Sequence, residues 1–188
     1  MAWHIIAALL ATSLSNTPAP PVAPIEHLSA TAIEMTSPAR IGLRPVDIVI
    51  DRWSTGIEHD ALKRALLENS PAAFMDRLST FAPIGAIQMA GGREFAIRYA
   101  WGAVERDGSR RIFVAVDEPI TLEHAVRRPP GPPLTFLEIR LDRSGRGSGK
   151  LSEADRISVD ETQDVIGLTG YEGRPVHLLD VRSLLDED

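Results

Sequence analysis

The segment SGRGSGKLS, residues 144–152, contains the Gly-Lys pair with which phosphate-binding loops end. Such a loop has the pattern Gly-x4-Gly-Lys-Ser/Thr, because its backbone amides surround phosphate and its hydroxyl binds magnesium. Here Ser144 occupies the first glycine position and Leu151 the hydroxyl position, and no helix has room to begin before the next strand-like segment. The segment therefore predicts a Gly-rich hairpin turn, and we expect no nucleotide or other cofactor.

The five histidines do not have the spacing of a metal site or a catalytic pair. No two of them stand as His-x3-His with a glutamate, the arrangement found in zinc enzymes. We expect His59, between two acidic residues, to lie on the solvated side of a helix, and His177 to be a partly buried, hydrogen-bonded strand residue. The chain has no cysteine, which excludes disulfides, thiolate metal sites and cysteine nucleophiles. We predict no catalytic residue and no metal site.

Three charged residues alternate with apolar neighbours in two strand-like segments. Arg98, Glu138 and Arg140 are predicted to share one solvated face of a sheet, because successive side chains of a strand point to opposite faces. Cross-strand ion pairing accounts for such a set at about 0.2–1 kcal/mol per pair. The functional alternative is a shallow site for a small acidic ligand.

The segment RRPPGPP, residues 127–133, combines two positive charges with a stiff proline-rich backbone. Arg127, Arg128 and Pro130 are the candidate residues of an interaction loop, because polyproline segments are often recognised by proteins. The alternative is a rigid connector into the strand that we expect to follow.

Apolar periodicity predicts the elements that position these residues. Thr55 and Glu58 have the spacing of a capping box at the start of one helix, and Ser70 followed by Pro71 indicates the start of a second helix. Period-two or β-branched segments predict strands over 46–53, 93–101, 110–117, 134–142, 156–160, 164–169 and 175–182. We predict an α+β fold, an antiparallel sheet of about six to eight strands with the two N-terminal helices packed on one face.

The period-two pattern of residues 93–101 places four aromatic or aliphatic side chains on one face. We expect Phe95, Ile97, Tyr99 and Trp101 to be core residues on that face. Residues 110–117 are apolar on both faces in the middle of the segment, which predicts an interior strand.

The start of the chain differs in composition from the rest. Residues 1–23 contain no Asp, Glu, Lys or Arg and include the apolar run IIAALLATSL, which predicts a secretion signal. Residues 24–45 are rich in Pro, Ala, Ser and Thr and predict a tether of low order, followed by one domain over 46–188. No later segment is apolar enough to cross a membrane, so we expect no membrane insertion after signal removal.

The segments DRWST, IRYAW, RRIFVAVDEPI, LTFLEIRLDRSGRGSGKL and RPVHLLDVR follow one another in this order. Over residues 46–182 the chain resembles an uncharacterised family of small bacterial exported proteins without assigned activity. The resemblance implies a fold and an exported setting, and it supplies no catalytic or ligand residues.

The net charge of −6 argues against nucleic-acid binding, which favours a basic surface. Because of the predicted secretion signal, we expect an exported domain, periplasmic or extracellular. Because no catalytic or metal pattern occurs, we expect it to act without catalysis, by binding or assembly. Its expected partner is a protein or a small acidic ligand. The alternative is a cell-envelope hydrolase whose site is assembled from residues distant in sequence.

Overall fold

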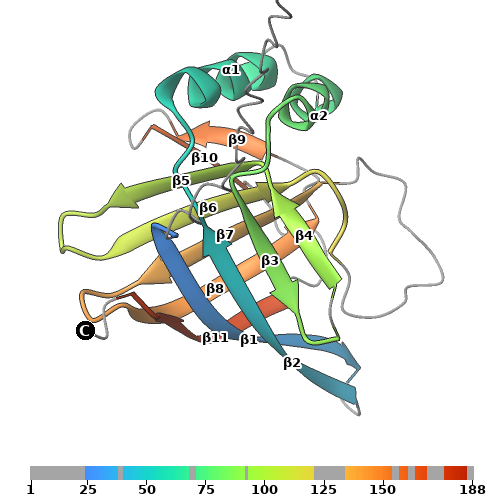
Figure 1. Ribbon diagram of the computed structural model, residues 1–188, viewed down its shortest axis with the longest axis vertical. Coiled ribbons are helices and arrows are strands. Elements are labelled where there is room, and N and C mark those ends of the chain that lie inside the picture. The colour runs from blue at the N-terminus through green and yellow to red at the C-terminus, as the bar shows by residue number, and fades with distance from the viewer. Residues whose placement is uncertain are drawn as a thin grey trace, which may run out of the picture.

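The computed structural model describes residues 24–37, 40–67, 71–91, 93–120, 134–153, 157–160, 164–168 and 176–185 (Figure 1). Its two helices are α1 (Gly56–Leu67) and α2 (Pro71–Ser79). Its strands are β1 (Glu26–Ser37), β2 (Arg40–Ile50), β3 (Gly85–Met89), β4 (Arg93–Ile97), β5 (Tyr99–Val104), β6 (Arg110–Val116), β7 (Thr135–Leu141), β8 (Arg146–Glu153), β9 (Ile157–Asp160), β10 (Val165–Leu168) and β11 (Val176–Ser183).

Nine of these strands form one antiparallel sheet in the order β4-β3-β2-β1-β11-β8-β7-β6-β5. The two outermost strands, β4 and β5, follow each other in the chain and are separated by Arg98 alone. The sheet therefore curls until its ends meet at this residue, which makes it nearly closed and barrel-like. Strands β9 and β10 form a separate hairpin.

The predicted α+β class with six to eight strands is wrong, because the described chain is mostly β with eleven strands and two short helices. The largest omission is β1, which lies in the segment predicted to be a low-order tether over 24–45. This strand pairs with β2 on one side and with β11 on the other. Pairing on both edges satisfies the backbone of β1, whereas its own sequence carries little strand signal.

The interior of the curled sheet is filled by aliphatic side chains. Residues at alternate positions of most strands of the nine-stranded sheet point inward, as the pleat requires. The largest contributions come from Leu28, Ile48, Ile50, Ile87, Phe95, Ile97, Ile112, Val114, Leu137, Ile139, Leu141, Leu151, Leu178 and Val181. A sheet of this size leaves an interior that side chains can fill, so packing of this core stabilises the curled sheet.

A second core lies on the outer face of β5, β6 and β7, under α1, α2 and the β9–β10 hairpin. Figure 1 shows these elements stacked above β5. Its main members are Leu62, Phe74, Leu78, Tyr99, Phe113, Phe136, Val165 and Ile166. Strand β6 is buried on both faces from Ile112 to Val116, which confirms the prediction of an interior strand over 110–117. The helices do cover one face of a sheet, but only over three strands.

The predicted shared face of residues 93–101 is wrong. Phe95 and Ile97 point into the interior core, whereas Tyr99 and Trp101 lie in the outer core. The cause is an irregularity at Arg98, which belongs to neither strand.

At this irregularity two residues face one partner. The backbone N–H of Arg98 donates to the carbonyl of Ala115 at 3.1 Å, and Tyr99 is also paired with Ala115. The extra residue shifts the alternation by one, as in a β-bulge, so the side chains on its two sides point to opposite faces. This shift joins the interior core to the outer core within one stretch of chain.

The Gly-rich segment is partly a turn and partly a strand. The turn covers residues 142–145, where Gly145 has a φ of 72°. The predicted turn is wrong beyond that point, because residues 146–153 form β8. Gly147 is required there by close strand approach, since an added Cβ would lie 1.7 Å from the carbonyl oxygen of Arg140.

The predicted secretion signal over 1–23 lies outside the described residues and stays a prediction. In the part of the chain that the structure describes, neither helix is both long and apolar enough to span a bilayer.

Candidate functional site

An open groove of about 610 Å³ lies on the outer face of β6, β7, β8 and β11, on the part of that face beside the second core. Its polar lining consists of Arg111, Glu138, Arg140, Ser148, Lys150 and His177. These six side chains define the outer groove.

Cross-strand register arranges the lining in two rows. Glu138 is paired with Lys150, and Lys150 with His177, so one row crosses β7, β8 and β11. Arg140 is paired with Arg111 on one side and with Ser148 on the other, which forms the second row across β6, β7 and β8. Residues directly opposite each other have Cβ atoms about 4.5–5.5 Å apart, so neighbours in each row lie within side-chain reach.

One carboxylate oxygen holds the two arginines together. Glu138 Oε1 lies 2.7 Å from Arg111 Nη2 and 3.4 Å from Arg140 Nε. Arg111 and Glu138 are largely buried, with 15% and 13% of their side chains exposed, whereas Arg140 is 66% exposed. Arg111 also lies over the ring of Phe113, 5.0 Å from its centroid. The floor of the groove is thus fixed by Arg111 and Glu138, and Arg140 faces solvent above it.

The lining carries more positive than negative charge. It contains three cationic side chains and one carboxylate, in a protein whose net charge is −6. Like charges directly opposite each other on neighbouring strands destabilise a sheet, and Arg111 opposite Arg140 is such a pair. Guanidinium groups match the geometry of carboxylate and phosphate. The arrangement is therefore suited to an anionic ligand.

The structure separates one predicted ligand-face residue from the other two. Glu138 and Arg140 share the outer groove, as expected for residues two positions apart on one strand, whose side chains point to the same face. Arg98 lies at the bend between β4 and β5, where its Nη1 donates to the Phe81 carbonyl at 2.6 Å and its Nε lies 2.6 Å from Asp117 Oδ2. Arg98 therefore connects the turn that follows α2 to the bend.

The loop candidates Arg127, Arg128 and Pro130 lie outside the described residues. Sequence reasoning also missed the groove residues Arg111, Lys150 and His177 as ligand candidates. For Arg111, its alternation with apolar residues in its segment was the one sequence signal of an outward position. For Lys150 and His177 there was none, because their cross-strand neighbours depend on the strand register.

A second polar cluster lies under α1, and it corrects the expectation that His59 is solvated. His59 is 1% exposed, its ring stacks on Trp101 with centroids 4.1 Å apart, and its Nδ1 lies 2.7 Å from the Tyr99 hydroxyl. Its Nε2 lies 3.5 Å from Asp164 Oδ1, and Lys63 forms an ion pair with the same carboxylate.

Burial sets the protonation state of this cluster. Desolvation lowers the pKa of His59 against the opposing effect of Asp164, and desolvation raises the pKa of Tyr99. Because the pKa of Asp164 is itself lowered, chiefly by its hydrogen bond with Lys63, that carboxylate only accepts. A neutral imidazole with its proton on Nε2 would present a donor to this carboxylate, and its Nδ1 would then accept from the Tyr99 hydroxyl. The cluster ties α1 to β5 and to the start of β10.

Comparison of the chain with protein-family models, with curated proteins and with solved structures gave no match. The resemblance to small exported bacterial proteins is thus an expectation from sequence.

Proposed function

We propose that this protein is a non-catalytic binding module whose outer groove holds a small acidic ligand. The proposal is carried by one observation: Arg111 and Arg140 stand directly opposite each other and share one oxygen of Glu138. Glu138 and Glu105 pair with the largely buried Arg111, so folding accounts for that residue. Arg140 is 66% exposed and lies 3.4 Å from Glu138, so its guanidinium faces solvent, where a negatively charged ligand can reach it.

The burial of the groove residues divides their roles. Arg111, held between Glu138 and the ring of Phe113, is fixed before any ligand arrives. Arg140 and Lys150 are exposed at the open side, where they meet a ligand first. A preorganised groove floor combined with exposed cations favours a compact anion that bears carboxylate or phosphate groups.

The hydrolase alternative has less support than binding. A hydrolase needs a nucleophile activated by a neighbouring base. The outer groove contains Ser148 and His177, both among the described residues, but no hydrogen bond joins these two side chains. His59 has its Nδ1 at the Tyr99 hydroxyl and its Nε2 near Asp164, and stacking on Trp101 covers its ring. With 1% of its surface exposed, that imidazole cannot reach a substrate.

The test is a calorimetric and NMR titration with two probes, citrate for carboxylates and inorganic phosphate for phosphate groups. We expect saturable binding of at least one probe, weakened by added salt because the contacts are ionic. Arg140→Gln and Lys150→Gln should each weaken that binding about tenfold or more, since a hydrogen bond to a charged group contributes about 1.5–3 kcal/mol.

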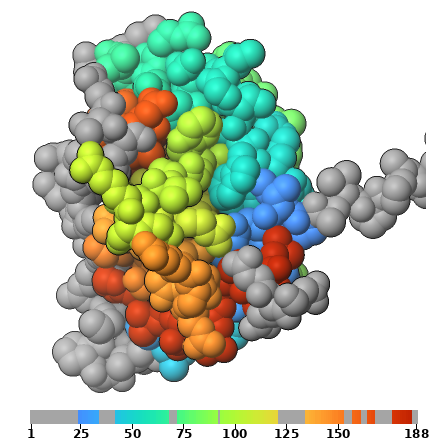
Figure 2. Space-filling model, turned by 90° about the vertical axis from the view of Figure 1, so that its left-hand side faces the viewer, coloured from blue at the N-terminus to red at the C-terminus, as the bar shows by residue number. Residues whose placement is uncertain are grey.

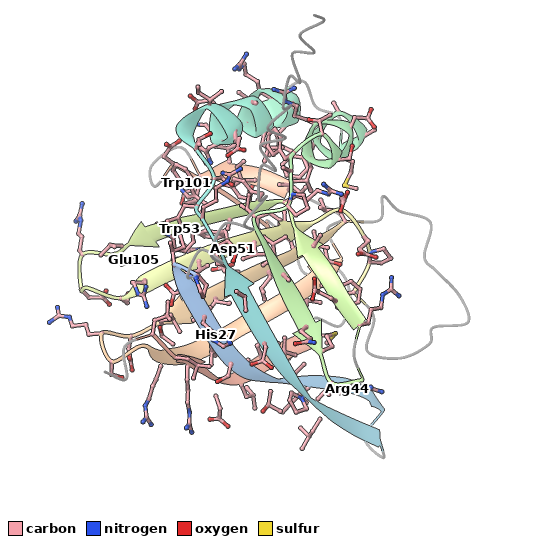
Figure 3. All side chains as sticks on the ribbon, in the orientation of Figure 1. His27, Arg44, Asp51, Trp53, Trp101 and Glu105 are labelled. Carbon is pink, nitrogen blue, oxygen red and sulfur yellow. The ribbon has the colours of Figure 1, made fainter. Side chains whose placement is uncertain are left out.

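Arg44→Gln is the matched control. Arg44 is exposed on β2 and lies in Figure 3 near the far end of the β1–β2 hairpin, so it makes the same charge change away from the groove. Equal weakening in Arg44→Gln would show that only net charge matters. That result, or the lack of saturable binding of both probes, would refute the proposal.

A further inference from the structure

The first row of the outer groove continues beyond the groove onto β1 and β2. Residues that stand directly opposite each other on neighbouring strands share one face of the sheet. His177, at the end of that row, is paired with Ile33 on β1, and Ile33 is paired with Leu43 on β2. The row of Glu138, Lys150 and His177 therefore leads into two apolar side chains on the same outer face.

A second apolar row lies beside the first. Leu179, which lines the groove on β11, is 42% exposed. It is paired with Thr31 on β1, and Thr31 is paired with Pro45 on β2. Pro45 is exposed, and the exposed fraction of Leu43 is 62%. Ile33, Leu43, Pro45 and Leu179 define the apolar strip.

A bulge in β11 accompanies the exposure of Leu179. The register of β11 against β8 shifts between Leu178 and Val181, and Asp180 has a φ of 50°. Leu178 and Val181 both lie in the interior core, so two residues stand between two inward positions instead of one. Such bulges often occur beside functional sites, where they redirect a side chain. Here the bulge leaves Leu179 exposed at the end of the groove while its buried neighbours stay in the core.

The apolar strip is continuous with the groove. Figure 2 shows β8 in orange beside β11 in red, and Figure 1 shows β1 and β2 continuing the sheet on the other side of β11. Two strand spacings separate Leu179 on β11 from Leu43 on β2, which amounts to about 10 Å across the strands. Single exposed leucines are normal on protein surfaces, but contiguous apolar surface at the end of a polar groove indicates binding.

We propose that the ligand of the outer groove is a single-chain amphiphile, a fatty acid or an alkyl phosphate in chemical class. This inference rests on the proposed function, because the head group of the amphiphile is the compact anion that binds at Arg140. The alkyl chain then leaves the groove over Leu179 and lies along Ile33 and Leu43. Covering these side chains removes apolar surface from water and adds to the affinity of the charged contacts.

The contacts of Arg140 leave it able to hold the head group. Its one ion pair within the described part of the chain is to Glu138, through Nε at 3.4 Å. A guanidinium has five N–H donors, so those on Nη1 and Nη2 face solvent on a side chain that is 66% exposed. Two such donors match two oxygens of a carboxylate or a phosphate.

Charge and size favour a free amphiphile over two larger occupants. An anionic membrane surface attracts basic proteins, whereas this chain has a net charge of −6. A stable dimer buries about 800 Å² on each partner, or roughly 20–30 residues. The apolar strip has too few side chains for such an interface, but they suffice to cover one alkyl chain.

The test compares inorganic phosphate, butyl phosphate and octyl phosphate in calorimetric titrations of the full chain, below the micelle concentration of each probe. The three probes share a head group, so differences in affinity report on the chain. A fully buried methylene group tightens binding about fourfold, so a chain half-buried on an open strip should gain about twofold per methylene. Octyl phosphate should therefore bind about tenfold or more tightly than butyl phosphate.

Leu179→Ser and Leu43→Ser test where the chain lies. Leu179 is next to the head group, so Leu179→Ser should weaken the binding of both alkyl phosphates. Leu43 lies two strands further away, so Leu43→Ser should weaken octyl phosphate about threefold to tenfold and leave butyl phosphate unchanged. Leu67→Ser is the matched control, because Leu67 is also 62% exposed but lies at the end of α1, away from the strip (Figure 1). Thermal unfolding checks that all three variants are folded.

The outcomes separate this inference from the proposed function. Equal affinities for inorganic phosphate, butyl phosphate and octyl phosphate would overturn the amphiphile and leave the anion site in place. Octyl phosphate binding that Arg140→Gln does not weaken would show adsorption of the chain alone and overturn the inference. Equal weakening by Leu67→Ser and Leu43→Ser would do the same. Failure of citrate, phosphate and both alkyl phosphates to bind would refute the proposed function and the inference with it.

Two sedimentation measurements test the other occupants. We expect no binding to phosphatidylglycerol vesicles and no concentration-dependent dimer. Vesicle binding that Leu43→Ser abolishes would assign the apolar strip to a membrane surface. A dimer that Leu43→Ser abolishes would assign it to a second copy of the chain. Either result would overturn the proposal of a free amphiphile.

Discussion

The buried His59 should make the outer core sensitive to mild acid. His59 is neutral in the folded protein because burial lowers its pKa below the ordinary value of 6.5. In the unfolded chain the imidazole is solvated and takes up a proton near that ordinary value. The unfolded state therefore binds more protons than the folded state as the pH falls below about 6.5.

The sign and size of the effect follow from proton linkage. The free energy of unfolding has its full value above about pH 6.5 and decreases as the pH falls below it. The slope cannot exceed about 1.4 kcal/mol per pH unit for one proton. Between pH 7.5 and pH 5.5, protonation of the histidine in the unfolded state should therefore lower the free energy of unfolding by up to about 1.4 kcal/mol. The exposed Asp164 reduces the loss, because its carboxylate favours the charged imidazole.

The assay is urea unfolding of the protein and of His59→Gln over this pH range, followed by tryptophan fluorescence. Glutamine is uncharged at all these pH values and can still hydrogen-bond the Tyr99 hydroxyl, so the variant keeps the contact and loses the titration. All other groups are the same in both proteins, so their contributions cancel in the difference. If the two proteins lose stability in parallel between pH 7.5 and pH 5.5, the lowered pKa of His59 is refuted.

Two further predictions concern β8 and α1. Gly147→Ala should destabilise the protein by about 2–4 kcal/mol in thermal or urea unfolding, because the new Cβ would lie 1.7 Å from the Arg140 carbonyl oxygen; Gly42→Ala, with no atom within 4 Å of its Cβ, should have little effect. Glu58→Gln should cost about 1–2 kcal/mol at pH 7, because it removes the ion pair with Arg52 and weakens the cap of α1. Since the hydrogen bond to Arg52 is the main cause that lowers the pKa of Glu58 to about 2, this difference should disappear in unfolding measurements as the pH falls from 4.5 toward 2.

Both helices were predictable because their signals are local. The Thr55 and Glu58 capping box forms as expected, with the Thr55 N–H donating to Glu58 Oε2 at 2.7 Å and the Glu58 N–H donating to Thr55 Oγ1 at 3.2 Å. The second helix begins at Pro71, as the Ser-Pro pair indicated. Capping depends on residues a few positions apart, so sequence alone identifies it.

The alternation of β7 was predictable in the same way. Leu137, Ile139 and Leu141 face the interior, and Glu138 and Arg140 face the outer groove. This is why sequence reasoning placed two of the groove residues together. It failed for Arg98, because a single extra residue at the bend reverses the faces on either side of it.

Local sequence signals account for the two helices, the doubly buried β6 and the alternation within β7, and the composition excludes cysteine chemistry. Tertiary structure alone decided that β1 and β8 are strands, that His59 is buried, and that Arg111, Lys150 and His177 line the groove with Glu138 and Arg140. Helix caps and alternation arise from contacts within a few residues, so the local sequence encodes them. Strand partners and the curl of the sheet arise from hydrogen bonds between distant residues, and only the folded register fixes them.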